Sequence, residues 1–356
     1  MRSRRTTALR KELSRLRLDA LLVTSLRNIR YLTGFTGSNA LCIVTTKGQY
    51  FVTDPRYAIQ SRAEVRGWKR FITADSLAGE AVRQKLLARC RRLGFESSHL
   101  DYARYRSYKR QFGEQALIAT EGIVEQLGIA KSVSEIARIR SAVAITERVF
   151  KEILKLIRPG VSELDLSAEI SYRQRRYGAE KDAFDPIVAS GIRSALPHAR
   201  ASRKKVKAGE GIILDFGCVV EGYHSDLTRT VFVENVSRKM KEIYNLVRKA
   251  QEHAIHATRS NMEARELDAV ARETINNGGW GRHFVHSLGH GLGLDVHEAP
   301  RVSLLSRDTL VQGCVITIEP GVYVPNLGGV RIEDDVVVTK RGCDVLTRSS
   351  KELIIL

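Results

Sequence analysis

The 356-residue sequence lacks the features that mark a membrane protein, a secreted protein or a zinc ribbon. No stretch is both long enough and apolar enough to span a bilayer. The basic N-terminus is followed by Lys11, Glu12 and Arg15 where a secretory signal would have an apolar segment. The five cysteines are scattered and never form a CxxC pair, which is typical of reduced thiols. We therefore expect a cytoplasmic protein without a membrane partner.

The charge of the chain is strongly and unevenly positive, with a formal net charge of +18. Residues 1–128 hold 24 Lys and Arg against 11 Asp and Glu, a net charge of +13, and the remainder has a net charge of +5. Only Arg89, Arg91 and Arg92 form a tight basic cluster, and no RNA-binding signature accompanies them. We interpret the excess as a solvated basic surface and do not expect nucleic acid as a partner.

The first 128 residues alternate between strand-like and helix-like patterns, which predicts a small α/β domain. An amphipathic helix is expected from Leu77 to Leu93, ended by Gly94. Short apolar runs predict strands at Ala20 to Val23, Ala40 to Val44 and Tyr50 to Val52, the last two forming a hairpin.

From residue 129 to 356 the pattern changes to longer helices that alternate with strands. Apolar residues between Ile136 and Ile157 recur on one face of a long helix, which Pro159 ends. Ser162 and Asp165 have the spacing of a capping box, so a second helix begins there. Two further helices are predicted at Arg238 to Arg259 and at Glu263 to Asn277.

Two antiparallel hairpins are also predicted in this second domain. The first joins Gly211–Cys218 to Gly222–Val233, and the second joins Val315–Val324 to Gly329–Thr339. Helices and strands therefore suggest an α+β domain in which helices pack on a largely antiparallel sheet.

Four carboxylates in these hairpins lie among apolar residues, where burial of an unpaired charge costs several kcal/mol. Hairpin pairing can bring Asp215 beside Asp226, and Glu319 beside Glu333. Carboxylates that cluster in this way must retain protons or surround a cation. The sequence therefore predicts a metal site at the centre of a curved sheet.

His290 is the fifth candidate ligand, within a glycine-rich segment from His286 to Glu298. The glycines favour a loop or strand whose backbone passes close to a metal, despite the helical spacing of His286 and His290. A lone acidic residue in a strand is more often an edge charge or one partner of an ion pair. A lone histidine is more often a hydrogen-bonded core residue. Five such positions together favour the metal site.

These residues lie in segments whose order resembles the pita-bread metallopeptidases, a family of Xaa-Pro aminopeptidases, prolidases and methionine aminopeptidases. The likeness continues through NIRYLTGFTGSNA (Asn28–Ala40) and TDPRY (Thr53–Tyr57). It implies a pita-bread catalytic domain at 129–356 and a smaller creatinase/prolidase-like α/β domain at 1–128. The segments of the second domain are SGIRSALPHA (Ser190–Ala199), DFGCVVEGYHSDLTRT (Asp215–Thr230), HSLGHGLGLDVHEAP (His286–Pro300), TIEPGVY (Thr317–Tyr323) and GGVRIEDD (Gly328–Asp335).

The resemblance implies two divalent metal ions per subunit, held by Asp215, Asp226, His290, Glu319 and Glu333. Asp226 and Glu333 would bridge the ions, Asp215 would hold one of them, and His290 with Glu319 would hold the other. Oxygen ligands with one imidazole favour Mn²⁺, with Co²⁺ or Zn²⁺ as alternatives. A hydroxide bridging the metals would attack the scissile carbonyl, and Glu319 would carry a proton to the leaving proline nitrogen.

The resemblance also implies roles for three histidines and one arginine. His198, His286 and His297 match positions that contact substrate and stabilise the tetrahedral intermediate. Arg331 shares a strand face with Glu333 and would anchor the substrate or orient the carboxylates.

Intact ligands argue against creatinase, which shares the fold without the metal ligands. The N-terminal domain argues against methionine aminopeptidase. Chain length and NIRYLTGFTG (Asn28–Gly37) favour an Xaa-Pro aminopeptidase acting on short peptides with proline at the second position. The alternatives are an Xaa-Pro dipeptidase (prolidase) and a non-catalytic relative that binds protein or RNA. Relatives of this type imply a homodimer.

Overall fold

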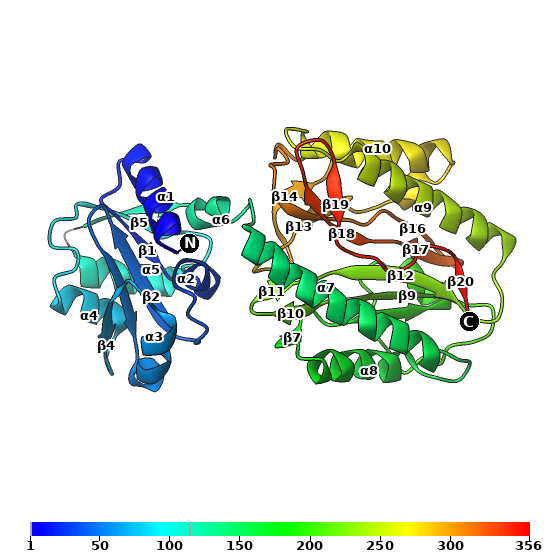
Figure 1. Ribbon diagram of the computed structural model, residues 1–356, viewed down its shortest axis with the longest axis horizontal. Coiled ribbons are helices and arrows are strands. Elements are labelled where there is room, and N and C mark those ends of the chain that lie inside the picture. Colours follow the sequence, from blue (N-terminus) through cyan, green and yellow to red (C-terminus); the bar gives the residue numbers. More distant parts are fainter. Residues whose placement is uncertain (1, 114) are drawn as a thin grey trace. The chain divides into compact units, whose positions relative to one another are not determined.

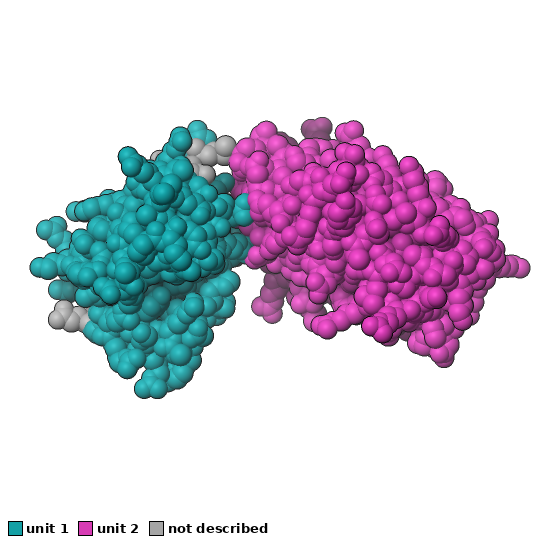
Figure 2. Space-filling model, turned by 90° about the horizontal axis from the view of Figure 1, so that it is seen from below, with its two compact units in different colours: residues 1–128 teal, residues 129–356 magenta. Residues whose placement is uncertain are grey.

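The computed structural model describes residues 2–113 and 115–356. The chain divides into two compact units, Met1–Gly128 and Ile129–Leu356, which Figure 2 colours separately. Both units combine helices with strands, which confirms the α+β class expected from the sequence. Across the described residues, every helix is too short or too polar to reach from one side of a lipid bilayer to the other.

The N-terminal unit is built on one six-stranded sheet in the order β4-β3-β2-β1-β5-β6 (Figure 1). The expected hairpin is confirmed, with Ile43 of β2 opposite Tyr50 of β3. The strands are β1 (Ala20–Val23), β2 (Ala40–Thr45), β3 (Gln49–Thr53), β4 (Lys69–Ile72), β5 (Arg92–Glu96) and β6 (Ala116–Thr120). The helices are α1 (Arg2–Arg15), α2 (Leu26–Thr33), η1 (Pro55–Tyr57), α3 (Ala58–Glu64), α4 (Leu77–Arg83), α5 (Tyr102–Phe112) and α6 (Ile123–Leu127).

The helix expected from Leu77 to Leu93 is wrong in its second half. Its helical part, α4, ends at Arg83, and Lys85 then adopts a left-handed φ of 52° that no α-helix can continue through. Leu93 lies in the inner strand β5, opposite Ala20 of β1. A Cβ on Gly94 would lie 2.9 Å from a leucine side chain, so this glycine permits close packing in the strand rather than ending a helix.

The helices of the C-terminal unit follow the sequence pattern closely. The long helix begins at Val133 and ends at Ile153, slightly earlier than predicted. The capping box of Ser162 and Asp165 is confirmed at the start of the next helix. The elements are α7 (Val133–Ile153), η2 (Leu154–Leu156), α8 (Glu163–Arg176), η3 (Gly191–Ala195), α9 (Arg238–Ala257), α10 (Ala264–Asn277) and η4 (Gly281–His283).

The strands of this unit form several short sheets with the orders β11-β10-β7, β20-β12-β9-β8, β14-β13-β15-β18-β19 and β16-β17. The early strands are β7 (Lys181–Asp182), β8 (Ile187–Ser190), β9 (Gly211–Phe216), β10 (Cys218–Val220), β11 (Tyr223–His224) and β12 (Leu227–Phe232). The later strands are β13 (Gly289–Gly291), β14 (Glu298–Val302), β15 (Val315–Ile318), β16 (Gly321–Val324), β17 (Gly328–Arg331), β18 (Asp334–Val338), β19 (Cys343–Val345) and β20 (Ile354–Ile355).

The C-terminal unit consists of two similar halves, each with a pair of helices packed on its own strands. In the first half (133–232), one apolar core joins α7 and α8 to β8, β9 and β12. In the second half (238–338), another core joins α9 and α10 to the strands from β15 to β18. In Figure 1, α8 and α10 lie on opposite sides of the strands. The hairpin of β9 and β12 in the first half and the strands β15 to β18 of the second half lie next to each other, and the backbone N–H of Glu333 donates to the carbonyl of Thr228.

Candidate metal centre

The first half supplies two of the candidate carboxylates from one hairpin. β9 and β12 pair antiparallel, with Asp215 opposite Thr228. Asp226 lies just before β12, two positions nearer the turn, so the two aspartates are neighbours without facing each other directly. Both are buried, at 8% and 5% exposure.

The second half supplies Glu319 and Glu333 from a hairpin that is interrupted where these residues lie. Ile318 is opposite Asp334 on one side of the interruption, and Gly321 is opposite Arg331 on the other side. This constant register places Glu319 across from Glu333, as the sequence predicted from hairpin pairing. The backbone N–H of Glu333 donates to the carbonyl of Thr228 at 3.1 Å, which joins the two halves beside these residues.

His290 lies in the middle of the short strand β13, between two glycines at which neighbouring backbone atoms leave no space for a side chain. A Cβ on Gly289 would lie 2.0 Å from the carbonyl oxygen of Thr317. A Cβ on Gly291 would lie 2.2 Å from the carbonyl oxygen of Ala299. No larger residue fits at either position, and the segment is a strand, as its glycines led us to expect despite the helical spacing of the histidines.

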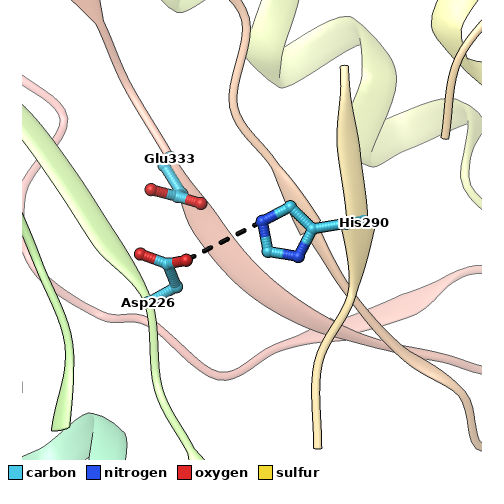
Figure 3. A group of neighbouring side chains, drawn as sticks. All are labelled: Asp226, His290 and Glu333. Atoms are coloured by element: carbon cyan, nitrogen blue, oxygen red, sulfur yellow. Dashed lines mark ion pairs between the residues drawn. The ribbon is translucent and has the colours of Figure 1, made fainter. Parts of the chain in front are cut away.

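The two halves bring together a three-residue group that could hold a metal ion (Figure 3). One ligand atom from each of Asp226, His290 and Glu333 lies within 4.8 Å of the others. The Nε2 atom of His290 is 3.8 Å from Asp226 Oδ2 and 3.3 Å from Glu319 Oε1. Glu319 therefore borders the group, and Asp215, in strand β9, lines the same pocket.

Burial and mutual repulsion set the electrostatics of this group. Burial raises the pKa of Asp226 and Glu333 well above the usual carboxylate range. The charge of Asp215 raises the pKa of Asp226 further, and the charge of Asp226 does the same for Glu333. Burial likewise raises the pKa of Asp215, although the charge of Arg331 opposes the shift. These groups thus hold protons more tightly than free carboxylates do, unless a cation replaces the protons.

Glu319 differs from the other carboxylates. Burial alone would raise its pKa, but the hydrogen bond and positive charge of His290 outweigh this and lower the pKa to about 2. His290 responds in the opposite direction: burial lowers its pKa, and the hydrogen bond and charge of Glu319 reverse this and raise it. The two side chains thus form an ion pair within the group.

The residues present fit a divalent cation. Among the described residues, Asp215 Oδ1, Asp226 Oδ1, Glu333 Oε1 and Asp335 Oδ1 are buried carboxylate oxygens without a hydrogen-bond partner. Several unpartnered anionic oxygens around one imidazole are costly to bury but match the donors of a metal that prefers oxygen and nitrogen ligands.

Arg331 connects this group to its surroundings. It is 3% exposed and forms an ion pair with Asp215 through Nη2. Its Nη1 donates to the hydroxyl of Tyr323 at 2.6 Å, and its Nε donates to Thr228 Oγ1 at 3.2 Å. Thr228 Oγ1 in turn donates to Glu333 Oε2 at 2.7 Å. The guanidinium therefore orients carboxylates from both halves.

His286 has both of its ring nitrogens bonded within the protein. Nε2 lies 2.9 Å from the hydroxyl of Tyr323, and Nδ1 lies 2.8 Å from the carbonyl of Ser287. Because Tyr323 accepts from Arg331, its single hydroxyl proton is donated to Nε2, and Nδ1 carries the ring proton. Burial lowers the pKa of His286, in agreement with this neutral form.

A charged pair on α10 holds the segment that contains His286. Arg272 donates to the carbonyl of His286 at 2.9 Å, and Asp268 Oδ1 accepts from the backbone N–H of Leu288 at 2.9 Å. The carbonyl of Leu288 then accepts from the backbone N–H of Glu319 at 2.8 Å. Asp268 is fully buried, so this pair links α10 rigidly to the metal group.

The two other histidines that the resemblance singled out, His198 and His297, differ from His286 because their rings form no hydrogen bond with a described residue. His198 is exposed, and its ring forms no hydrogen bond with any described residue. The ring of His297 lies 4.3 Å from that of His290 in an edge-to-face arrangement, and burial lowers its pKa. Both rings, with His286 and all five candidate ligands, line one pocket of 1070 Å³.

Sequence reasoning missed several polar residues that support the site. Asp335 is fully buried and accepts from the backbone N–H of Asp226 at 3.0 Å. Tyr323 and the pair Asp268–Arg272 were also missed. An acidic pair at positions 334 and 335 inside an apolar strand was a usable signal, because it repeats the pattern that identified Glu333. His224 donates to the carbonyl of Gly293 at 3.0 Å and is a hydrogen-bonding neighbour.

The chain matches two family models over most of its length. Residues 137–340 match Metallopeptidase family M24, and residues 5–128 match the Creatinase/Prolidase N-terminal domain. It is 41% identical to the uncharacterized peptidase YqhT of Bacillus subtilis, over 98% of this chain and 99% of that protein. It is 36% identical to the Xaa-Pro dipeptidase of Pyrococcus furiosus, over 95% of each chain.

Solved structures give the same result. The Xaa-Pro dipeptidase from Bacillus anthracis has a TM-score of 0.98 and 40% identity, with both chains covered completely. The X-Pro aminopeptidase from Thermotoga maritima has a TM-score of 0.91 and 35% identity, over 97% of this chain and 100% of that chain. The fold is therefore the expected pita-bread domain with a smaller creatinase-type N-terminal domain. The chain belongs to metallopeptidase family M24, as the order of its motifs predicted.

Proposed function

We propose that the protein is a two-metal peptidase that hydrolyses the bond before proline, with free Xaa-Pro dipeptides as its preferred substrates. The observation that carries the proposal is the convergence of five candidate ligands on one pocket, with buried carboxylate oxygens left unpartnered among the described residues. The sequence favoured an aminopeptidase. The comparisons support the dipeptidase alternative better, because the Bacillus anthracis and Pyrococcus furiosus proteins carry that name.

The proposed ligands are the five that the motifs imply. Asp226 and Glu333 would contact both ions, Asp215 one ion, and His290 with Glu319 the other. A bound pair of divalent ions would lower the pKa of a bound water and polarise the scissile carbonyl. Mn²⁺ remains the proposed metal, and the homodimer and cytoplasmic location remain predictions.

Other side chains of the pocket would transfer a proton, stabilise the oxyanion and position Arg331. Glu319, which is ionised and faces His290, would accept a proton from the attacking water and deliver it to the proline nitrogen. His198 and His297 would donate to the developing oxyanion, because their rings are not already bonded to described residues. His286 would instead hold the Tyr323 hydroxyl that positions Arg331.

In an Xaa-Pro dipeptide the terminal carboxylate is attached to the proline itself. A dipeptidase therefore needs a positively charged side chain one residue beyond the scissile bond. Arg301 is exposed and lines the pocket, and its backbone N–H is fixed by Asp308 Oδ2 at 2.8 Å. A guanidinium pairs with a carboxylate through two parallel hydrogen bonds. We assign Arg301 to the terminal carboxylate of the dipeptide.

The test compares Ala-Pro, Ala-Pro-amide and Ala-Pro-Ala, with Mn²⁺ and with EDTA. We expect Ala-Pro to have a kcat/KM at least about tenfold above the other two, and EDTA to stop turnover. Arg301→Ala should reduce kcat/KM for Ala-Pro about tenfold to a hundredfold and change that for Ala-Pro-amide little. Arg307→Ala is the matched control, since Arg307 is exposed in the same segment but does not line the pocket.

Each other outcome has a definite meaning. Faster cleavage of Ala-Pro-Ala than of Ala-Pro would restore the aminopeptidase assignment. Equal losses for Ala-Pro and its amide in Arg301→Ala would remove the role of Arg301. Failure of the Mn²⁺-loaded protein to cleave any of the three would overturn the proposed function.

A further inference from the structure

His198 lies in the segment from Ser190 to Ser202 and lines the pocket. The backbone conformation of this segment determines where the imidazole can lie. The ring of His198 forms no hydrogen bond with any described residue, in contrast to His286. Since no described residue bonds the ring, the backbone is what limits the region that the imidazole can occupy. The position of His198 therefore depends on whatever fixes this segment.

Glu163, the first residue of α8, is bonded to both ends of the segment. Oε1 accepts from the backbone N–H of Ser190 at 2.8 Å and from its hydroxyl at 2.9 Å. Oε2 accepts from the hydroxyl of Ser202 at 2.7 Å and from its backbone N–H at 3.1 Å. One carboxylate thus joins residues that are twelve positions apart and lie on either side of His198.

The middle of the segment is tied to the same carboxylate. Arg193 forms an ion pair with Glu163 at 3.0 Å, and its Nη2 donates to the carbonyl of Arg200 at 2.6 Å. Glu163 is fully buried, so these bonds form in a region of low dielectric where they are strong. Its charge is also favoured by the N-terminus of α8.

We propose that Glu163 is a positioning residue that sets the location of the His198 imidazole over the metal centre. The inference rests on the proposed function for the identity of the reaction but not for the geometry. Glu163 has no need to cap the helix, because Ser162 and Asp165 already form the capping box of α8. Its carboxylate is instead directed at the segment of His198.

Asp165 is therefore the matched control. It lies in the same first turn, is exposed, and accepts from the hydroxyl and backbone N–H of Ser162. Asp165→Asn disturbs the start of α8 without touching the segment from Ser190 to Ser202. Glu163→Gln keeps the size of the side chain but places an NH₂ group against N–H and hydroxyl donors, so the four bonds cannot all form.

The kinetic test is a double-mutant cycle on the Mn²⁺-loaded enzyme with Ala-Pro. Glu163→Gln should lower kcat about tenfold to a hundredfold, with a smaller change in KM. In a His198→Ala background the same change should cost less than about twofold, because the group it positions is gone. Asp165→Asn should leave kcat within about twofold in both backgrounds. Equal losses from Glu163→Gln with and without His198 would overturn the proposal.

Amide hydrogen exchange gives a readout that needs no activity. In Glu163→Gln the amides of Ser190 and Ser202 should lose protection about tenfold or more, while residues 284–291 keep theirs. Unchanged exchange at both serines would also overturn the proposal. If the wild-type protein cleaves no Xaa-Pro substrate, the proposed function fails, and the exchange result still decides the role of Glu163.

A second variant covers the case in which Glu163→Gln does not fold. Ser202→Ala removes the hydroxyl that donates to Oε2 and accepts from the backbone N–H of Lys204 at 3.2 Å, and it leaves the carboxylate buried with its other partners. It should lower kcat a few-fold, again only when His198 is present. A fully active Ser202→Ala variant in which the backbone amide of position 202 has lost its protection would show that the segment does not govern His198.

Discussion

The two halves of the C-terminal unit are built alike but hold their histidines in different ways. In the first half, a carboxylate at the start of α8 bonds the backbone around His198 and leaves the ring free. In the second half, Asp268 and Arg272 of α10 bond the backbone around His286, and Tyr323 and Ser287 also bond its ring. Both imidazoles line the pocket, but only the ring of His286 is bonded to other described residues.

This difference matches the role proposed for each imidazole. A group that donates to a reacting oxygen needs an unbonded N–H, so the protein can fix it only through its backbone. A group that orients Arg331 through Tyr323 has to be bonded itself. The comparison predicts that Asp226 of the first half and Glu333 of the second half are equally important for metal binding, whereas Glu163 and Asp268 support their histidine segments in different ways.

The largest expected effect tests the equivalence of the halves. Asp226→Ala and Glu333→Ala each remove a carboxylate that would contact both ions, so each should lower kcat by about a thousandfold or more. The fold should persist, because each change also removes a buried, repelling carboxylate. Steady-state kinetics after Mn²⁺ reconstitution, with circular dichroism, measures both properties. The exposed Asp344→Ala of β19 serves as the control.

A near-native rate in only one of the two variants would break the symmetric assignment. Near-native rates in both would remove the metal assignment altogether.

Metal removal should weaken the junction between the halves, and more so at higher pH. The folded pKa values of Asp226 and Glu333 are raised, so their protons stabilise the metal-free fold at low pH, and this stability is lost as pH rises through the raised pKa values. The raised pKa of His290 acts in the same direction. Glu319, with a pKa of about 2, has the opposite sign but acts only below the ordinary glutamate pKa.

We expect the melting temperature of EDTA-treated protein to fall by about 5 °C or more between pH 6 and pH 8, relative to the Mn²⁺-loaded protein. Thermal unfolding at matched ionic strength measures this difference. A gap between the two forms that narrows as pH rises would contradict the assigned electrostatics.

A smaller effect, on Mn²⁺ affinity, distinguishes Asp268, which bonds the segment of His286, from Glu163, which bonds the segment of His198. Asp268→Asn disturbs Leu288, whose carbonyl holds the backbone of Glu319, so Mn²⁺ affinity should fall about tenfold by titration calorimetry. Glu163→Gln should change this affinity less than about twofold. Glu266→Gln on the exposed face of α10 is the control. Equal metal affinities in Asp268→Asn and Glu163→Gln would remove the distinction between the halves.

Much of the fold followed from local patterns. Capping at Ser162, the helical stripe of α7 and the hairpin alternation around Asp215 each act over a few residues, so the sequence displays them directly. The helix expected to reach Leu93 failed because its end is decided by pairing with β1, which lies far away in the sequence. Apolar periodicity cannot distinguish a helix end from a short buried strand.

For the candidate site, too, the residues marked by a local pattern could be predicted from the sequence, and those that depend on tertiary contacts could not. Asp215 and Glu333 stood out because charge inside an apolar strand is locally visible. Glu163 and Asp268 did not, because an acidic residue in a first or second helical turn is usually solvent-exposed. Their burial depends on which distant backbone they face, and that is a property of the tertiary structure.

The glycines beside His290 set a limit on how this centre could be moved to another protein. Because Gly289 and Gly291 lie against the carbonyls of Thr317 and Ala299, the histidine is placed by the spacing of three strands rather than by its own rotamer. Grafting the five ligand side chains onto an unrelated scaffold would omit this spacing. The smallest transferable piece is therefore β13 together with the flanking strands β14 and β15, as a single packed block.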